Sequence, residues 1–197
     1  LYALPDAAKS STEGWRVGEN RIAVIAEPGI VYPGDLFDGH IIVNSPSNPI
    51  SAYDVEVTYD SRLLRVLGVE TGSSFFERPP TYNADDPGRI LINNSGIESE
   101  PRGIVELAVI EFQAWDVPWG ISQYVSIGIT VRDMANPNFQ NIEIAPIASG
   151  MYVQPRPVPT PVPTPTQLPT PTPTELPQPP QQITPLATPT LISTPTP

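Results

Sequence analysis

Proline is distributed very unevenly along this chain, and its distribution limits what each part can fold into. The 197 residues include 28 Pro, of which 16 lie between Pro155 and Pro197 together with 11 Thr. A proline ring fixes its own φ and keeps the preceding residue out of the helical region, so this segment favours extended polyproline II structure. It contains no aromatic residue with which to build a core. We therefore predict a polyproline II C-terminal tail over residues 154–197.

The residues before the tail show the pattern of an all-β protein. Short apolar runs, separated by Gly, Pro and Asn, recur about every ten residues, which is typical of a β-sandwich. In the clearest runs every second residue is apolar, which predicts strands with one buried face and one solvent-exposed face. The predicted strands are Arg21–Ala26, Leu36–Asn44, Ser51–Tyr59, Leu64–Glu70, Arg89–Asn93, Ile104–Trp115, Val125–Val131, Asn141–Ile147 and Gly150–Val153. We predict one nine-stranded domain of two packed sheets over residues 21–153, preceded by an extended N-terminal arm over residues 1–20.

Two connections in this domain carry specific expectations. Asp60 is placed to cap a single helical turn before the next strand. The long stretch 71–88 has no strand pattern but contains Phe75, Phe76 and Tyr82. Because these aromatic side chains argue against a free loop, we expect the stretch to fold over an open end of the sandwich.

Charge and composition exclude several classes of protein. The formal net charge is −11 and Lys9 is the only lysine, whereas a nucleic-acid-binding face needs clustered basic residues. Without cysteine the chain has no disulfide and no thiolate metal site. No apolar run approaches the roughly 18 residues of a membrane span. Because the chain starts at Leu1 rather than Met, we expect a processed chain whose export signal, if it had one, is already gone.

Candidate catalytic residues are scarce. The single histidine, His40, falls on the polar side of its strand and is expected at the surface. The chain has no Gly-x-Ser-x-Gly motif of the kind that presents a nucleophilic serine. Asp54, Glu56, Asp85 and Asp86 could form a carboxylate pair, but carboxylates that alternate along a strand normally form its solvated face. We therefore predict that the protein is not an enzyme.

One connection has the oxygen-rich composition that calcium prefers. Asp133, Asn136, Asn138 and Asn141 crowd this connection, although their spacing does not match an EF-hand. Asn and Asp also occur in turns because of backbone geometry alone. We predict no metal site and no cofactor, with calcium as the alternative at these four residues.

Two further patterns concern carbohydrate. Asn93-Asn94-Ser95 matches the N-glycosylation acceptor pattern. Trp15, Trp115 and Trp119 could stack on sugars if exposed, or could instead close the end of the core.

The tail has the composition of O-glycosylated stalks, in which threonine is flanked by proline. Its candidate acceptors are Thr160, Thr164, Thr166, Thr170, Thr172, Thr174, Thr184, Thr188, Thr190, Thr194 and Thr196.

Several segments, taken in order, resemble cohesin modules. They are the Val31–Asp35 turn before a strand, the Ile50–Asp60 strand, the following Leu63–Gly72 segment, and the later Gly103–Ala114 strand, which follows a glycine. The resemblance covers about residues 21–153. It implies a cohesin-like, nine-stranded jelly-roll β-sandwich that is exported and has no catalytic residues. Typical cohesins bind calcium-loaded dockerins through one sheet face and are joined by Pro/Thr-rich linkers.

Three functions fit these observations. The first is a self-associating structural subunit of an extracellular filament or layer on a bacterial surface, with a glycosylated tail. In that assembly Leu1, Tyr2 and Leu4 of the arm would anchor it on a neighbour's sheet edge. The second is a cohesin-type module that binds a dockerin-bearing partner. The third is a carbohydrate-binding module.

Overall fold

A computed structural model of the chain describes residues 15, 18–72, 78–95, 101–115, 117 and 121–157. These residues contain eleven β-strands and no helix. The strands are β1 Arg21–Glu27, β2 Ile30–Val31, β3 Leu36–Ser45, β4 Ala52–Thr58, β5 Leu64–Thr71, β6 Thr81–Asn83, β7 Arg89–Ser95, β8 Gly103–Ala114, β9 Gln123–Ala135, β10 Ala145–Pro146 and β11 Ser149–Val153.

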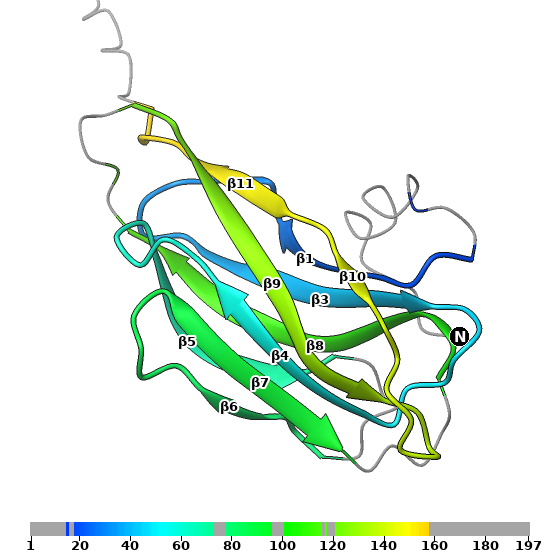
Figure 1. Ribbon diagram of the computed structural model, residues 1–197. Coiled ribbons are helices and arrows are strands. Elements are labelled where there is room, and N and C mark those ends of the chain that lie inside the picture. Colours follow the sequence, from blue (N-terminus) through cyan, green and yellow to red (C-terminus); the bar gives the residue numbers. More distant parts are fainter. Residues whose placement is uncertain are drawn as a thin grey trace, which may run out of the picture. The chain divides into compact units, whose positions relative to one another are not determined.

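The strands form two sheets that pack face to face as a sandwich (Figure 1). The five-stranded sheet has the order β10-β1-β3-β8-β5, and the six-stranded sheet has the order β2-β11-β9-β4-β7-β6. Neighbouring strands are antiparallel, except for the parallel pairs β1–β10 and β2–β11. Chain neighbours such as β3 and β4 lie in different sheets, which is the jelly-roll arrangement. The predicted all-β jelly-roll sandwich is confirmed.

Eight of the nine predicted strands are present, with ends within a few residues of those expected. The prediction of a strand over Asn141–Ile147 is wrong, because only Ala145 and Pro146 form a strand there, as β10, and Asn141 makes an isolated bridge. Ile142 and Ile144 are buried between exposed neighbours, so the alternation is real. The Ile142 amide, however, bonds to the Met134 carbonyl outside any named strand pair. Strands β2 and β6 have two and three residues and are too short to show a sequence pattern.

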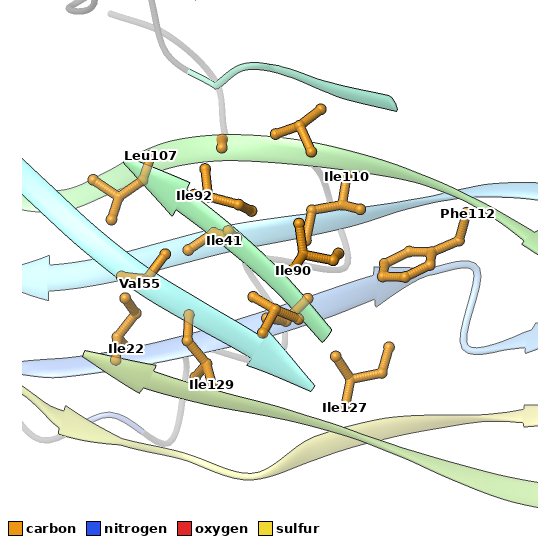
Figure 2. Close-up of a cluster of buried hydrophobic side chains, with 14 of the residues drawn as sticks. Ile22, Ile41, Val55, Ile90, Ile92, Leu107, Ile110, Phe112, Ile127 and Ile129 are labelled. Atoms are coloured by element: carbon orange, nitrogen blue, oxygen red, sulfur yellow. The ribbon is translucent and has the colours of Figure 1, made fainter. Parts of the chain in front are cut away.

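The core lies between the two sheets and is built from the inward positions of both (Figure 2). Phe112 of β8 is the largest fully buried side chain. Its ring stacks on Phe37, with centroids 5.3 Å apart, and meets the edge of Tyr59 at 5.5 Å. Gly39 gives this ring its space, since a Cβ there would lie 2.8 Å from Phe112 Cε2. The aromatic group therefore ties β3, β8 and the end of β4 together.

A hydrogen bond crosses the core at a β-bulge in β8. Ile41 faces Ala108 and Ile42 faces Glu106, so Leu107 is an extra residue in β8. An extra residue in a bulge disturbs the ladder of backbone hydrogen bonds. Tyr53, on the opposite sheet, donates its hydroxyl hydrogen to the Leu107 carbonyl at 3.0 Å. This bond links β4 of one sheet to β8 of the other.

The turn at Asp60 is confirmed. Its carbonyl accepts hydrogen bonds from the amides of Leu63 and Leu64, at 3.0 and 2.9 Å. Its Oδ1 accepts from the Arg62 amide at 2.9 Å, as a capping side chain does. Hydrogen bonds from the Arg62 side chain also lower the pKa of Asp60.

The stretch 71–88 differs from expectation in its described part. Thr81–Asn83 forms β6, which pairs with β7 and extends the six-stranded sheet at its edge. Tyr82 is 43% exposed there, so the prediction that it covers an open end is wrong. Phe75 and Phe76 lie outside the described residues.

Candidate functional site

The outer face of the five-stranded sheet is covered over β1 and β3, whereas Arg65 and Glu70 of β5 are exposed on the same face. Ala23, Ile25 and Ile42 point outward from β1 and β3 and yet are buried. Trp15 and Ile147 pack against them. This second, smaller cluster removes the middle of the face from contact with a partner.

His40 lies on this covered face and is only 9% exposed. Its Nδ1 lies 2.6 Å from Glu106 Oε1 on the neighbouring strand β8. The prediction of a surface histidine is therefore wrong, although its direction, away from the main core, is as expected. The hydrogen bond to Glu106 raises the pKa of His40, helped by the charges of Asp38 and Glu27 and opposed by burial.

This pair predicts that stability falls as pH rises. A histidine whose pKa is higher in the folded than in the unfolded state stabilises the fold at low pH. That contribution is complete below the unfolded pKa, about 6.5, and is lost as pH rises through the folded value. Because His40 is the only histidine, we expect urea melts at pH 6 to show a larger free energy of unfolding than melts at pH 8. His40→Gln should remove most of this difference between pH 6 and pH 8, and Glu106→Gln should reduce it. If the free energy of unfolding of His40→Gln still fell by the same amount between pH 6 and pH 8, the pH dependence would come from other groups.

The outer face of the six-stranded sheet is open by comparison. The strand register places its outward side chains in rows that run across β6, β7, β4 and β9. One row is Thr81, Asn93, Asp54 and Asp133, and the next is Asn83, Leu91, Glu56 and Thr130. All eight are half-buried or exposed.

The charges on this face are largely paired. Arg89 Nη2 lies 2.9 Å from Glu56 Oε2, and Arg89 Nη1 lies 3.4 Å from Asp86 Oδ2. Arg132 Nε is 4.0 Å from Asp54 Oδ2. Such partly exposed pairs contribute little stability, but they fix a pattern of charge across the face.

A pocket of about 180 Å³ opens on this face beside Asp54 and Asp133. Asn93 and Ser95 of the N-glycosylation pattern also line it, and both are exposed. The carboxylate candidates Asp85 and Asp86 lie instead in the turn between β6 and β7. Among the described residues, no group of three or more His, Cys, Asp or Glu side chains could hold a metal ion.

The calcium candidates have different places in the structure. Asp133 lies in β9, whereas Asn136 and Asn138 form the turn that follows it. Asn136 Oδ1 accepts hydrogen bonds from the amides of Asn138 and Gln140, at 2.9 and 3.0 Å. Asn141 pairs with the strand as an isolated bridge. Asn136 thus has the backbone role of a turn residue, and calcium stays the untested alternative to the prediction of no metal site.

Two tyrosines form an exposed group that the sequence did not single out. Tyr124 of β9 and Tyr152 of β11 are direct partners in the register. Their rings lie edge to face, with centroids 5.2 Å apart. Only the pairing of β9 with β11 brings the two residues together, and single-strand alternation does not show which strands pair.

The two tryptophans in the described part of the chain have different surroundings. Trp15 packs on the covered face of the five-stranded sheet, whereas Trp115 follows β8 and is 50% exposed. Its amide bonds to the Leu63 carbonyl.

Several predicted residues lie outside the described part of the chain. They are Trp119, the arm residues Leu1, Tyr2 and Leu4, and the eleven threonines of the tail. No helix in the described part has the length and apolar character needed to cross a bilayer.

Comparison with known proteins places the fold. No protein-family model matches the sequence, and a search of curated proteins also gives no match. Solved structures do match. A type I cohesin–dockerin complex from Clostridium thermocellum has a TM-score of 0.58 at 17% identity, covering 71% of this chain and 97% of that one.

Two other solved cohesins match over a similar span. One is the sixth cohesin of scaffoldin B from Acetivibrio cellulolyticus, solved in complex with a Cel5 dockerin mutant. It has a TM-score of 0.54 at 14% identity, and the match covers 69% of this chain and 98% of that one. A non-cellulosomal cohesin from the archaeon Archaeoglobus fulgidus has a TM-score of 0.55 at 13% identity, with coverages of 69% and 91%. The part of this chain before the Pro/Thr-rich tail has the cohesin fold.

Proposed function

We propose that this protein is a non-catalytic, extracellular module that binds a dockerin-type partner through the outer face of β6, β7, β4 and β9. The cohesin fold supports this function, because similar structures include cohesins in complex with dockerins. The Pro/Thr-rich tail then acts as a spacer. The 43 residues from Pro155 to Pro197 span on the order of 130 Å as polyproline II, and glycans on the threonines would keep the tail extended.

The contrast between the two outer sheet faces is the observation that carries the choice of surface. Ile25 and Ile42 on the five-stranded sheet are buried against Trp15 and Ile147, and His40 on the same face is also buried. On the six-stranded sheet the corresponding outward residues are accessible. Among the described residues, none has to be displaced for a partner to contact the rows on the second face.

The chemistry of this face suits a protein partner. Leu91 supplies an apolar contact between Asn83 and Glu56, and charged groups surround it, as at the rim of protein interfaces. Asp54, Glu56 and Asp133 exceed Arg89 and Arg132 by one charge, on a chain of net charge −11. We therefore expect the partner to present a positively charged surface, because complementary charge guides association and selects the partner.

The test is binding of the full chain to dockerin modules from its own source, measured by calorimetry with calcium present. We expect saturable binding that is lost when a chelator removes calcium from the partner. No binding to any of these dockerins would contradict the proposed function.

A matched pair of variants tests the face. Glu56→Arg reverses a charge on β4 beside Arg89, and Glu70→Arg makes the same change on β5 of the other sheet. Because like charges at an interface cost several kcal/mol, we expect Glu56→Arg to weaken binding at least about tenfold. Glu70→Arg should bind as the unmodified chain does. The reverse result would move the binding surface to the five-stranded sheet.

A further inference from the structure

The strongest unassigned feature of the molecule is an exposed aromatic surface at one corner of the six-stranded sheet. Three outward side chains form it: Tyr124 of β9, Tyr152 of β11 and Ile30 of β2. They are 57%, 48% and 48% exposed, and Tyr152 is the register partner of both of the others. We name these three residues the tyrosine platform. Clustered aromatic exposure of this kind marks interaction sites.

A glycine shapes the platform. A Cβ at Gly150 would lie 2.5 Å from both Cζ and the hydroxyl oxygen of Tyr124. The absent side chain therefore lets the Tyr124 ring lie across β11. Tyr152 meets it at an interplanar angle of 63°, so the two rings make an apolar corner rather than a single flat surface.

The platform carries no charge. Its outward neighbours, Ser126 and Gly150, are uncharged too. The ion pairs within this sheet lie on β4, β7 and the far end of β9, and Arg156, beyond the end of β11, is paired with Asp35. These side chains offer no opposite charge to a charged ligand. An uncharged ligand needs no such partner and can bind without one. The platform thus fits a neutral, largely apolar ligand.

We propose that the tyrosine platform binds the Pro/Thr-rich segment, residues 158–197, of a second copy of this chain. Proline-rich segments dock on surfaces lined by aromatic rings, and their preformed polyproline II conformation limits the entropy lost on binding. This segment matches the platform in charge, since Glu175 is its only ionisable side chain. Every copy of the chain carries both the surface and its ligand.

The path of the chain after β11 favours a second copy over the chain's own tail. Val153 pairs with Val31, and the Gln154 amide donates to the Val31 carbonyl at 2.9 Å. Arg156 Nη2 then donates to Pro33 O at 3.2 Å and to Asp35 Oδ1 at 2.7 Å. The chain thus continues along 31–35, away from Tyr152.

A contact of this kind joins two different surfaces, the platform of one copy and the segment of the next. Such a heterologous contact propagates into open chains unless its rotation closes a ring. The proposed contact gives the module a self-association surface at the corner formed by β9, β11 and β2. This surface is separate from the part of the face on β6, β7 and β4.

The test uses a fluorescent synthetic peptide of residues 158–197 and the full chain, with binding followed by anisotropy. We expect saturable binding that weakens at least about tenfold in the Tyr124→Ser, Tyr152→Ser double variant, because aromatic anchors carry much of the energy of such contacts. Tyr82→Ser removes an exposed tyrosine on β6 and should bind the peptide normally. A peptide with every Pro replaced by Ala should bind at least about tenfold more weakly.

Sedimentation velocity of the full chain supplies the second measurement. We expect species larger than the monomer to grow with concentration, and to disappear in the double variant but not in Tyr82→Ser. Equal peptide binding by the double variant would overturn the proposal, as would a full chain that binds the peptide but stays monomeric. Quenching of tyrosine fluorescence by soluble polysaccharides, without peptide binding, would also overturn it and assign the platform to carbohydrate.

Discussion

Phe112→Ala is expected to lower the free energy of unfolding by about 3–5 kcal/mol, the usual cost of removing a large buried aromatic side chain. The ring is fully buried, stacks on Phe37 and meets the edge of Tyr59. Its loss opens a cavity beside Gly39, which has no side chain to fill it. Urea melts followed by circular dichroism would measure the change.

Two control variants separate the cavity from the loss of the aromatic ring. Phe112→Leu keeps most of the volume and should cost clearly less than Phe112→Ala. Tyr82→Ala removes a ring that is 43% exposed at the sheet edge and should change stability little. A loss below about 1 kcal/mol in Phe112→Ala would mean that the core collapses around the site.

Tyr53→Phe is expected to cost about 1–3 kcal/mol, the penalty of leaving a buried polar group without its partner. The Tyr53 hydroxyl donates to the Leu107 carbonyl, at the bulge of β8 in the centre of the sandwich. Phenylalanine preserves the ring and its packing, so the variant removes only the hydrogen bonds of the hydroxyl, to the Leu107 carbonyl and to the Asn94 side chain. The change in urea midpoint at constant slope would report it.

The second prediction has a matched control in Tyr82→Phe, which removes a hydroxyl from an exposed tyrosine. It should be neutral within about 0.5 kcal/mol. If Tyr53→Phe were also neutral, water would have to reach the bulge carbonyl. Faster amide hydrogen exchange in β4 and β8, with little change elsewhere, would support the bond as a link between the sheets.

Much of the fold is predictable because burial imposes a period of two on each strand. In Leu36–Asn44 this period correctly directs Phe37, Ile41 and Val43 to the core and His40 away from it. It does not show that the opposite face is also covered. Trp15 and Ile147, which pack on that face, are far from His40 in sequence, so the histidine's burial depends on tertiary structure.

The candidate surfaces were less predictable for a related reason. Each depends on which strands are neighbours. Asp54 lies beside Asp133, and Tyr124 beside Tyr152, only because β9 lies between β4 and β11. The alternation of apolar and polar residues within one strand does not show the order of the strands in the sheet. The Asp60 turn, by contrast, is local, since its bonds reach no further than Leu64, and it was predicted correctly.

The place of β11 has a mechanical consequence for a module that carries a long extension. β11 lies between β9, to which it is antiparallel, and β2, to which it is parallel. A pull on Pro157 therefore acts nearly along the strand axis, after first straining the Arg156 contacts with Pro33 and Asp35. Tension would load the hydrogen bonds on both sides of β11 together, in shear, rather than opening them one at a time. The extension is thus attached to a strand whose hydrogen bonds on both sides would share the load.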